Sequence, residues 1–94
     1  MQSIIEAQKI LMREVIEGIS SNYLAEEFLE PVDWQGLWLY DYLKIITNPM
    51  DLTTLKKKID SYENLDQFLL DLFLIWDNCK KYNKFGTVKI LNKT

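Results

Sequence analysis

The side chains best suited to chemistry in this sequence are an amide, a phenol and a short turn motif. Asn83 is a neutral amide that follows a long apolar segment, Tyr42 lies in an apolar loop, and residues 49–52 read Pro-Met-Asp-Leu. Asn tolerates the left-handed conformation that ends helices, a Tyr ring usually packs with its hydroxyl in water, and the Pro-Met-Asp-Leu motif starts a helix. Taken alone, each feature therefore has an ordinary structural explanation.

The sequence gives little support to a catalytic or metal site. It contains no histidine, which removes the commonest general base, the Ser/His and Cys/His pairs, and most zinc sites. Cys79 is the single cysteine, so no internal disulfide and no Cys-x-x-Cys pair exists. Nothing in the sequence holds Asp33, Asp41 and Asp51 together as a carboxylate site. We expect no enzymatic activity, no metal and no cofactor.

Length, composition and charge predict one soluble domain over residues 1–94. The chain is 48% apolar and has three glycines and two prolines, which is typical of a folded core. No apolar run reaches the roughly 18 residues needed to cross a bilayer, so we expect an intracellular protein without membrane contact. The net charge of −3 argues against direct binding of nucleic acid. Residues 1–51 hold nine acids and three bases, which favours basic protein tails as partners.

Apolar spacing predicts amphipathic helices at about 3–20, 51–61 and 64–82. Asp51 is expected to cap the second helix, and Asn64 to begin the third in a variant of the capping box. The third helix is apolar nearly all round, which places it in the middle of a bundle.

The stretch between the first two helices has a different character. Residues 26–50 show no sustained helical period, contain both prolines and are rich in apolar side chains, so they are expected to form one long ordered loop with a function. Residues 88–94 are too short to form a helix on their own. The expected architecture is an all-α, antiparallel bundle with the long loop crossing one end.

Taken together, these motifs resemble the bromodomain family over about residues 28–90. The resemblance implies a left-handed, antiparallel four-helix bundle that reads acetylated lysine in histone or other protein tails, as a nuclear module of chromatin and transcription regulation. The last helix would be cut within this chain. The residues that carry the resemblance are Phe28, Pro31-Val32-Asp33, Asp41-Tyr42, Lys44-Ile45-Ile46, Pro49-Met50-Asp51-Leu52, Tyr62, Phe68, Asp71, Trp76-Asp77-Asn78-Cys79 and Tyr82-Asn83.

The resemblance also implies a binding site. Asn83 would donate from its side-chain NH₂ to the acetyl carbonyl, and Tyr42 would hold a water that bridges to the same oxygen. An apolar slot with one donor suits a neutral amide and rejects an ammonium, which is costly to bury unpaired. The other implied site residues are Phe28 and Val32 around the methyl group, Leu37 and Leu39 as a loop wall, Tyr82 as the floor, and Val88 as the gatekeeper.

Three departures from the family pattern leave alternatives open. Residues 26–28 read Glu-Glu-Phe where many members have Trp-Pro-Phe, and the two acids either favour basic residues beside the acetyl-lysine or are simply solvated. Trp34 or Trp38 either replaces the missing Trp or only packs. The gatekeeper falls within residues 88–90 (Val-Lys-Ile), and Val88 is preferred because a lysine would place a charge at the edge of the slot.

Two other functions compete with the reader. The first is an interaction scaffold that has the bromodomain shape but a pocket unable to bind acetyl-lysine. The second is a plain helical dimerisation unit. A shortened last helix would leave an apolar face on the bundle, from which self-association is expected.

Overall fold

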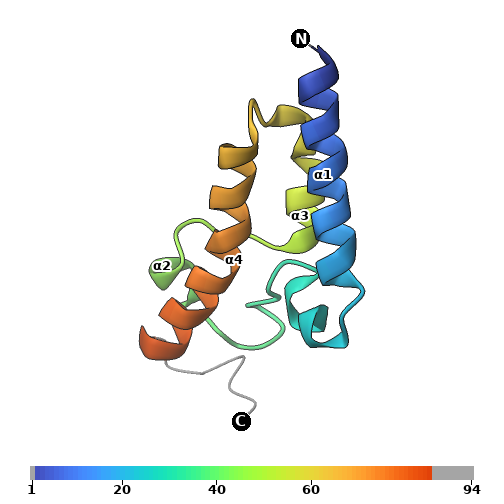
Figure 1. Cartoon of the computed structure of the whole chain (residues 1–94). Helices are drawn as coiled ribbons and strands as arrows, with labels where there is room; N and C mark the ends of the chain where they lie inside the picture. Colours follow the sequence, from blue (N-terminus) through green and yellow to red (C-terminus); the bar gives the residue numbers. More distant parts are fainter. Residues whose placement is uncertain (1, 86–94) are drawn as a thin grey trace.

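The computed structural model describes residues 2–85, and the predicted segment 88–94 lies outside the described residues. Helix α1 (Gln2–Ser20) and helix α4 (Leu65–Phe85) lie side by side, and the shorter helix α3 (Leu52–Lys57) runs in the opposite direction (Figure 1). Helix α1 ends at the predicted place, where the Ser21 hydroxyl donates to the carbonyl oxygen of Gly18 at 2.9 Å. The described residues therefore form the expected all-helical bundle.

Helices α3 and α4 begin with the predicted caps. A carboxylate oxygen of Asp51 accepts a hydrogen bond from the backbone N–H of Thr54 at 2.9 Å, and Asn64 accepts one from the N–H of Gln67 at 3.0 Å. The Gln67 side chain accepts in turn from the N–H of Glu63 at 2.7 Å. These bonds satisfy backbone donors that have no partner within the first turn of a helix.

The long connecting segment between α1 and α3, residues 21–51, is more regular than the sequence indicates. It contains the 3₁₀ helix η1 (Tyr23–Phe28) and the single-turn helix α2 (Tyr42–Ile45), both at the lower end of the bundle in Figure 1. A second 3₁₀ turn, η2 (Ile59–Ser61), follows α3. Turns this short are too brief to produce a recognisable hydrophobic period, so the prediction of one continuous loop was wrong in this detail.

Two apolar clusters hold these elements together. The larger one joins α1, α3 and α4, with Met12, Leu55 and Phe68 almost completely buried. The smaller one lies at the lower end and consists of Leu39, Tyr42, Ile46 and Tyr82, so it joins the connecting segment to α4. Local spacing predicts the first cluster, whereas the second depends on how the segment folds back on the helix.

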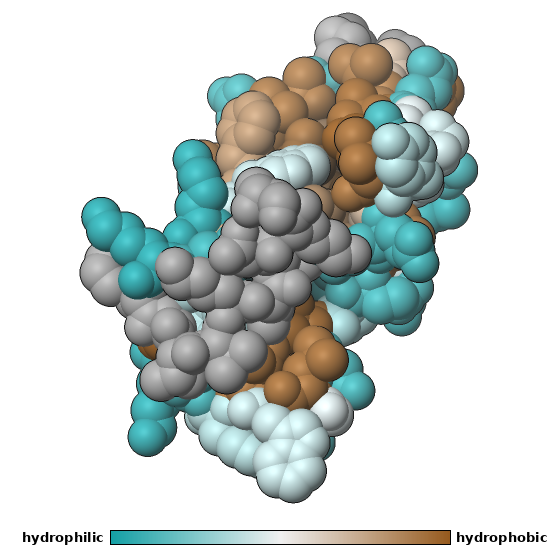
Figure 2. Space-filling model, turned by 90° about the horizontal axis from the view of Figure 1, so that it is seen from below, coloured by the Kyte–Doolittle hydropathy of each residue, from teal (hydrophilic) through white to brown (hydrophobic). Residues whose placement is uncertain are grey.

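Helix α4 is less enclosed than its sequence predicts. Leu70 is 72% exposed and Phe73 is 57% exposed among the described residues. Viewed from the lower end of Figure 1, hydrophobic surface shows in patches between hydrophilic flanks (Figure 2). No helix within residues 2–85 is long and apolar enough to span a membrane.

A polar cluster fastens the upper part of α4 to the turn after α3. The Asp71 carboxylate accepts hydrogen bonds from the Lys58 ammonium at 2.8 Å and from the Tyr62 hydroxyl at 2.6 Å. Partial burial raises the pKa of Asp71, but the two hydrogen bonds and the Lys58 charge outweigh it and lower the pKa below its usual value. Burial and the Asp71 carboxylate together raise the pKa of Tyr62.

The Asp71 cluster predicts acid sensitivity. A lowered folded-state pKa means that the unfolded chain binds the proton more readily, so the stabilisation is complete above about pH 4 and is lost as the pH falls through the folded-state value. Asp71→Asn should lower the free energy of unfolding at pH 7 by about 1–2 kcal/mol and reduce this loss, measured by urea denaturation at several pH values.

Asp77→Asn is the matched control on the same helix, because the one ion pair of Asp77 with the described residues is an exposed contact with Lys80 at 4.0 Å. Equal acid sensitivity in both variants would contradict this role for Asp71.

Candidate functional site

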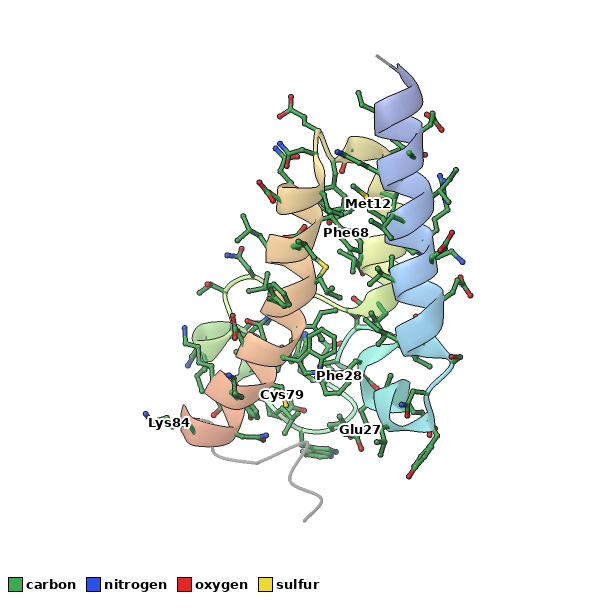
Figure 3. All side chains as sticks on the ribbon, in the orientation of Figure 1. Met12, Glu27, Phe28, Phe68, Cys79 and Lys84 are labelled. Atoms are coloured by element: carbon green, nitrogen blue, oxygen red, sulfur yellow. The ribbon has the colours of Figure 1, made fainter. Side chains whose placement is uncertain are left out.

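A small cavity lies where the connecting segment meets α4. Its free space is about 20 Å³, room for about one water molecule. Figure 3 shows two of its side chains, Phe28 from η1 and Cys79 from α4, at the same level of the bundle and below Met12 and Phe68 of the core. The cavity is lined by Glu27, Phe28, Glu30, Val32, Tyr42, Met50, Ile75, Asn78 and Cys79.

Hydrogen bonds from α4 fix the walls of this cavity. The side-chain NH₂ of Asn78 donates to the carbonyl oxygen of Asn48 at 2.8 Å and so holds the backbone just before α3. The Tyr82 hydroxyl donates to the Asp41 carboxylate at 2.5 Å, which holds the start of α2. Both donors belong to buried residues, for which an unmade bond would be costly. The connecting segment is therefore fastened to α4 at two points, Asn48 and Asp41.

The two tyrosines of the smaller cluster have different roles. Their rings pack at 5.1 Å between centroids, and both side chains are buried. The hydroxyl of Tyr82 is used by Asp41, whereas that of Tyr42 makes no hydrogen bond with the described residues. Burial, followed by the proximity of Cys79 and Tyr82, raises the pKa of Tyr42, so its phenol stays protonated at neutral pH. Tyr42 thus offers a neutral donor and acceptor at the cavity wall.

Asn83 touches the cavity through Cys79. Its NH₂ donates to the Cys79 sulfur at 3.6 Å, and its Oδ1 is buried without a hydrogen-bond partner among residues 2–85. Sulfur is a weak acceptor, so this amide is poorly satisfied for its degree of burial. Burial and the nearby Glu27 charge raise the pKa of Cys79 while the Asn83 hydrogen bond lowers it, with a net rise that keeps the thiol neutral.

The alternative of Asn83 as a helix cap does not hold. Helix α4 continues to Phe85, and among the described residues Trp38 is the one non-glycine residue with a positive φ, at 62°. Asn83 is therefore an ordinary helical residue one turn after Cys79, which places both side chains on the same face.

The remaining predicted site residues separate into three groups. Phe28 and Val32 line the cavity. Leu39 is 1% exposed within the smaller cluster, and Tyr82 is also part of that cluster, so the described structure places both in the core behind the cavity. Leu37 is not among the residues that line the cavity, and its side chain lies in a groove beside it. Val88 lies outside the described residues.

Neither tryptophan of the connecting segment enters the cavity. Trp34 packs against the smaller cluster, and Trp38 is 73% exposed. Both pack edge-on against the ring of Tyr40, at 6.3 Å and 6.1 Å between centroids. In the described structure, both tryptophan rings therefore pack against another residue of the connecting segment.

Sequence reasoning missed part of the lining. Cys79 precedes Asn83 by four residues, so helical spacing alone could have added it to the site. Met50 and Asn78 belong to motifs that carry the family resemblance, and Ile75 belongs to the apolar stripe of the predicted helix, but none of the three is among the predicted site residues. No group of His, Cys, Asp and Glu residues within 2–85 could hold a metal ion.

The difference between the two tyrosine hydroxyls gives a paired prediction. Tyr82→Phe should lower the free energy of unfolding by about 1.5–3 kcal/mol, because the Asp41 carboxylate loses a buried donor. Tyr42→Phe should change it by less than about 0.5 kcal/mol, because no hydrogen bond within the described structure is lost. Urea denaturation measures both, and equal losses would show that the two hydroxyls do not differ in this way.

Comparison with known proteins agrees with the fold and the motifs. A family model described as Bromodomain matches residues 12–91. The chain is 43% identical over 79 residues to the transcription factor GTE1 of Arabidopsis thaliana, and the match covers 79% of this chain and 20% of that protein. The chain thus spans about a fifth of the length of this relative. Bromodomains are generally readers of acetyl-lysine. With most of its length matched, the chain belongs to the bromodomain family.

Proposed function

We propose that this chain binds acetylated lysine in the cavity between the connecting segment and α4, with Asn83 as the anchor. The observation that carries the proposal is the poorly satisfied Asn83 amide: within the described part of the chain its NH₂ donates only to a sulfur and its Oδ1 has no partner. An acetylated lysine ends in an amide that offers one carbonyl acceptor and one N–H donor. The carbonyl would replace the weak thiol contact with a normal hydrogen bond.

The surroundings of Asn83 support selection of the acetylated form. Phe28 and Val32 supply an apolar wall for the acetyl methyl group, and the Cys79 thiol is neutral. Glu27 and Glu30 also line the cavity, so the apolar wall alone does not exclude an ammonium. The acetylated form is favoured because its neutral amide can satisfy the Asn83 NH₂, whereas an ammonium has no acceptor to offer it. Tyr42 would hold a bridging water through its open hydroxyl.

The cavity must widen to accept an acetyl group. Its 20 Å³ suits about one water molecule, so the lining side chains must move when the ligand enters. Met50 lines the cavity and has a flexible thioether chain that repacks at low cost. This adjustment draws on binding energy, and we expect a dissociation constant of about micromolar or weaker for one acetylated site.

The family and the relative suggest the setting of this activity. The relative is called a transcription factor, so we propose that the chain acts in the nucleus on acetylated histone tails. Binding and release of the mark would need no chemical step. The module would therefore act as a non-enzymatic reader.

Replacement of Asn83 separates recognition from folding. Asn83→Ala should weaken binding of a singly acetylated histone-tail peptide by at least about tenfold, because the acetyl carbonyl loses its donor. The free energy of unfolding should hold or rise slightly, since the variant removes a buried oxygen that has no partner. Calorimetric titration and urea denaturation give the two values.

The unmodified peptide is the ligand control, and Tyr42→Phe is the second site variant, with an intermediate loss expected from the bridging water. The narrow cavity favours the scaffold function as the second candidate. A folded protein that binds neither peptide would refute the reader and leave the scaffold.

A further inference from the structure

A second hollow lies directly beside the cavity. This groove has a volume of about 260 Å³ and is lined by Glu26, Glu27, Glu30, Pro31, Val32, Asp33 and Leu37. Glu27, Glu30 and Val32 also line the cavity. A peptide whose acetyl-lysine enters the cavity therefore has an adjoining place for a neighbouring side chain.

The groove is strongly acidic. Four of its seven lining residues are carboxylates, and none is basic. Two of the carboxylates are held in place, because Glu30 accepts from the Thr53 hydroxyl at 2.9 Å and Asp33 from the backbone N–H of Gly36 at 3.0 Å. No ion pair among residues 2–85 involves Glu26, Glu30 or Asp33. The groove thus presents negative charge that a cation from outside could meet.

The rest of the lining is apolar. Pro31, Val32 and Leu37 supply this part, and Leu37 is 55% exposed. Lysine and arginine side chains have the matching character, because their aliphatic stems pack on apolar surface while their charged ends remain near water. A small inorganic cation has no aliphatic part that could pack on this apolar surface.

We propose that Glu26 and Glu30, with Asp33, are specificity-determining residues that select acetyl-lysine with a lysine or arginine close to it in the same peptide. The proposal rests on the proposed function, since it places the acetyl group in the adjoining cavity. The basic side chain lies along Leu37 and Val32 and brings its charge to the carboxylates.

The test compares two peptides on three proteins by calorimetric titration. The peptides share one acetyl-lysine and differ only in the flanking arginines, which are kept in one and replaced by citrulline, the neutral isostere, in the other. The proteins are the wild type, Glu26→Gln/Glu30→Gln, and Glu14→Gln/Asp77→Asn. The last pair removes the same charge from residues that line neither the groove nor the cavity.

The wild type and the Glu14/Asp77 control should bind the arginine peptide more tightly than the citrulline peptide. The expected difference in dissociation constant is about two- to fivefold for each carboxylate that the cation contacts. Glu26→Gln/Glu30→Gln should lower this preference towards one, and added salt should lower it in the wild type. Equal binding of both peptides by the wild type, or an unchanged preference in the Glu26/Glu30 variant, would overturn the inference and leave the reader function intact. Failure of both peptides to bind would overturn the proposed function and the inference with it.

Discussion

The hydrogen bond between the Tyr82 hydroxyl and the Asp41 carboxylate is the constraint on which the lower end of the molecule depends. It joins residues 41 positions apart at 2.5 Å, and Tyr82 is completely buried. A buried hydroxyl needs a partner, and the partner here is the residue that begins α2. The bond therefore sets the position of Tyr42, the next residue, against the cavity. Together with the hydrogen bond from Asn78 to the Asn48 carbonyl, it fixes the connecting segment to α4.

Two neighbouring rows of α4 supply the groups that hold the connecting segment and the groups proposed for recognition. Asn78 and Tyr82 use their polar atoms to hold the connecting segment, whereas Cys79 and Asn83, each one residue later, turn theirs towards each other beside the cavity. Rigid helical spacing keeps the two pairs in register. The first pair has well-made hydrogen bonds, and the second pair has a weak one. Under the proposed function, stability and binding would be divided between adjacent positions of α4.

The features that could be predicted from the sequence are those that depend on interactions between residues close together in the chain. The bounds of α1, the caps at Asp51 and Asn64, and the all-helical class follow from apolar spacing and short-range hydrogen bonds. The burial of Leu39 was missed, because it depends on how the connecting segment folds back onto α4. The groove could not be predicted for the same reason, because it forms only when the folded segment brings Leu37 next to acidic residues several positions away. For the candidate site, the family resemblance indicated which residues to consider. That the Asn83 amide lacks good hydrogen-bond partners could be seen only in the three-dimensional structure.

The position of Cys79 makes the cavity accessible to selective chemistry. It is the single cysteine of the sequence, and it lines the space next to the Asn83 amide. A thiol-directed fluorophore or spin label would therefore attach to this chain at one known place, without removal of competing thiols. Because the pKa of this thiol is raised, labelling would proceed faster in mildly alkaline solution. The chain carries its own reporter of what enters the cavity, since an occupant would shield that sulfur from the reagent.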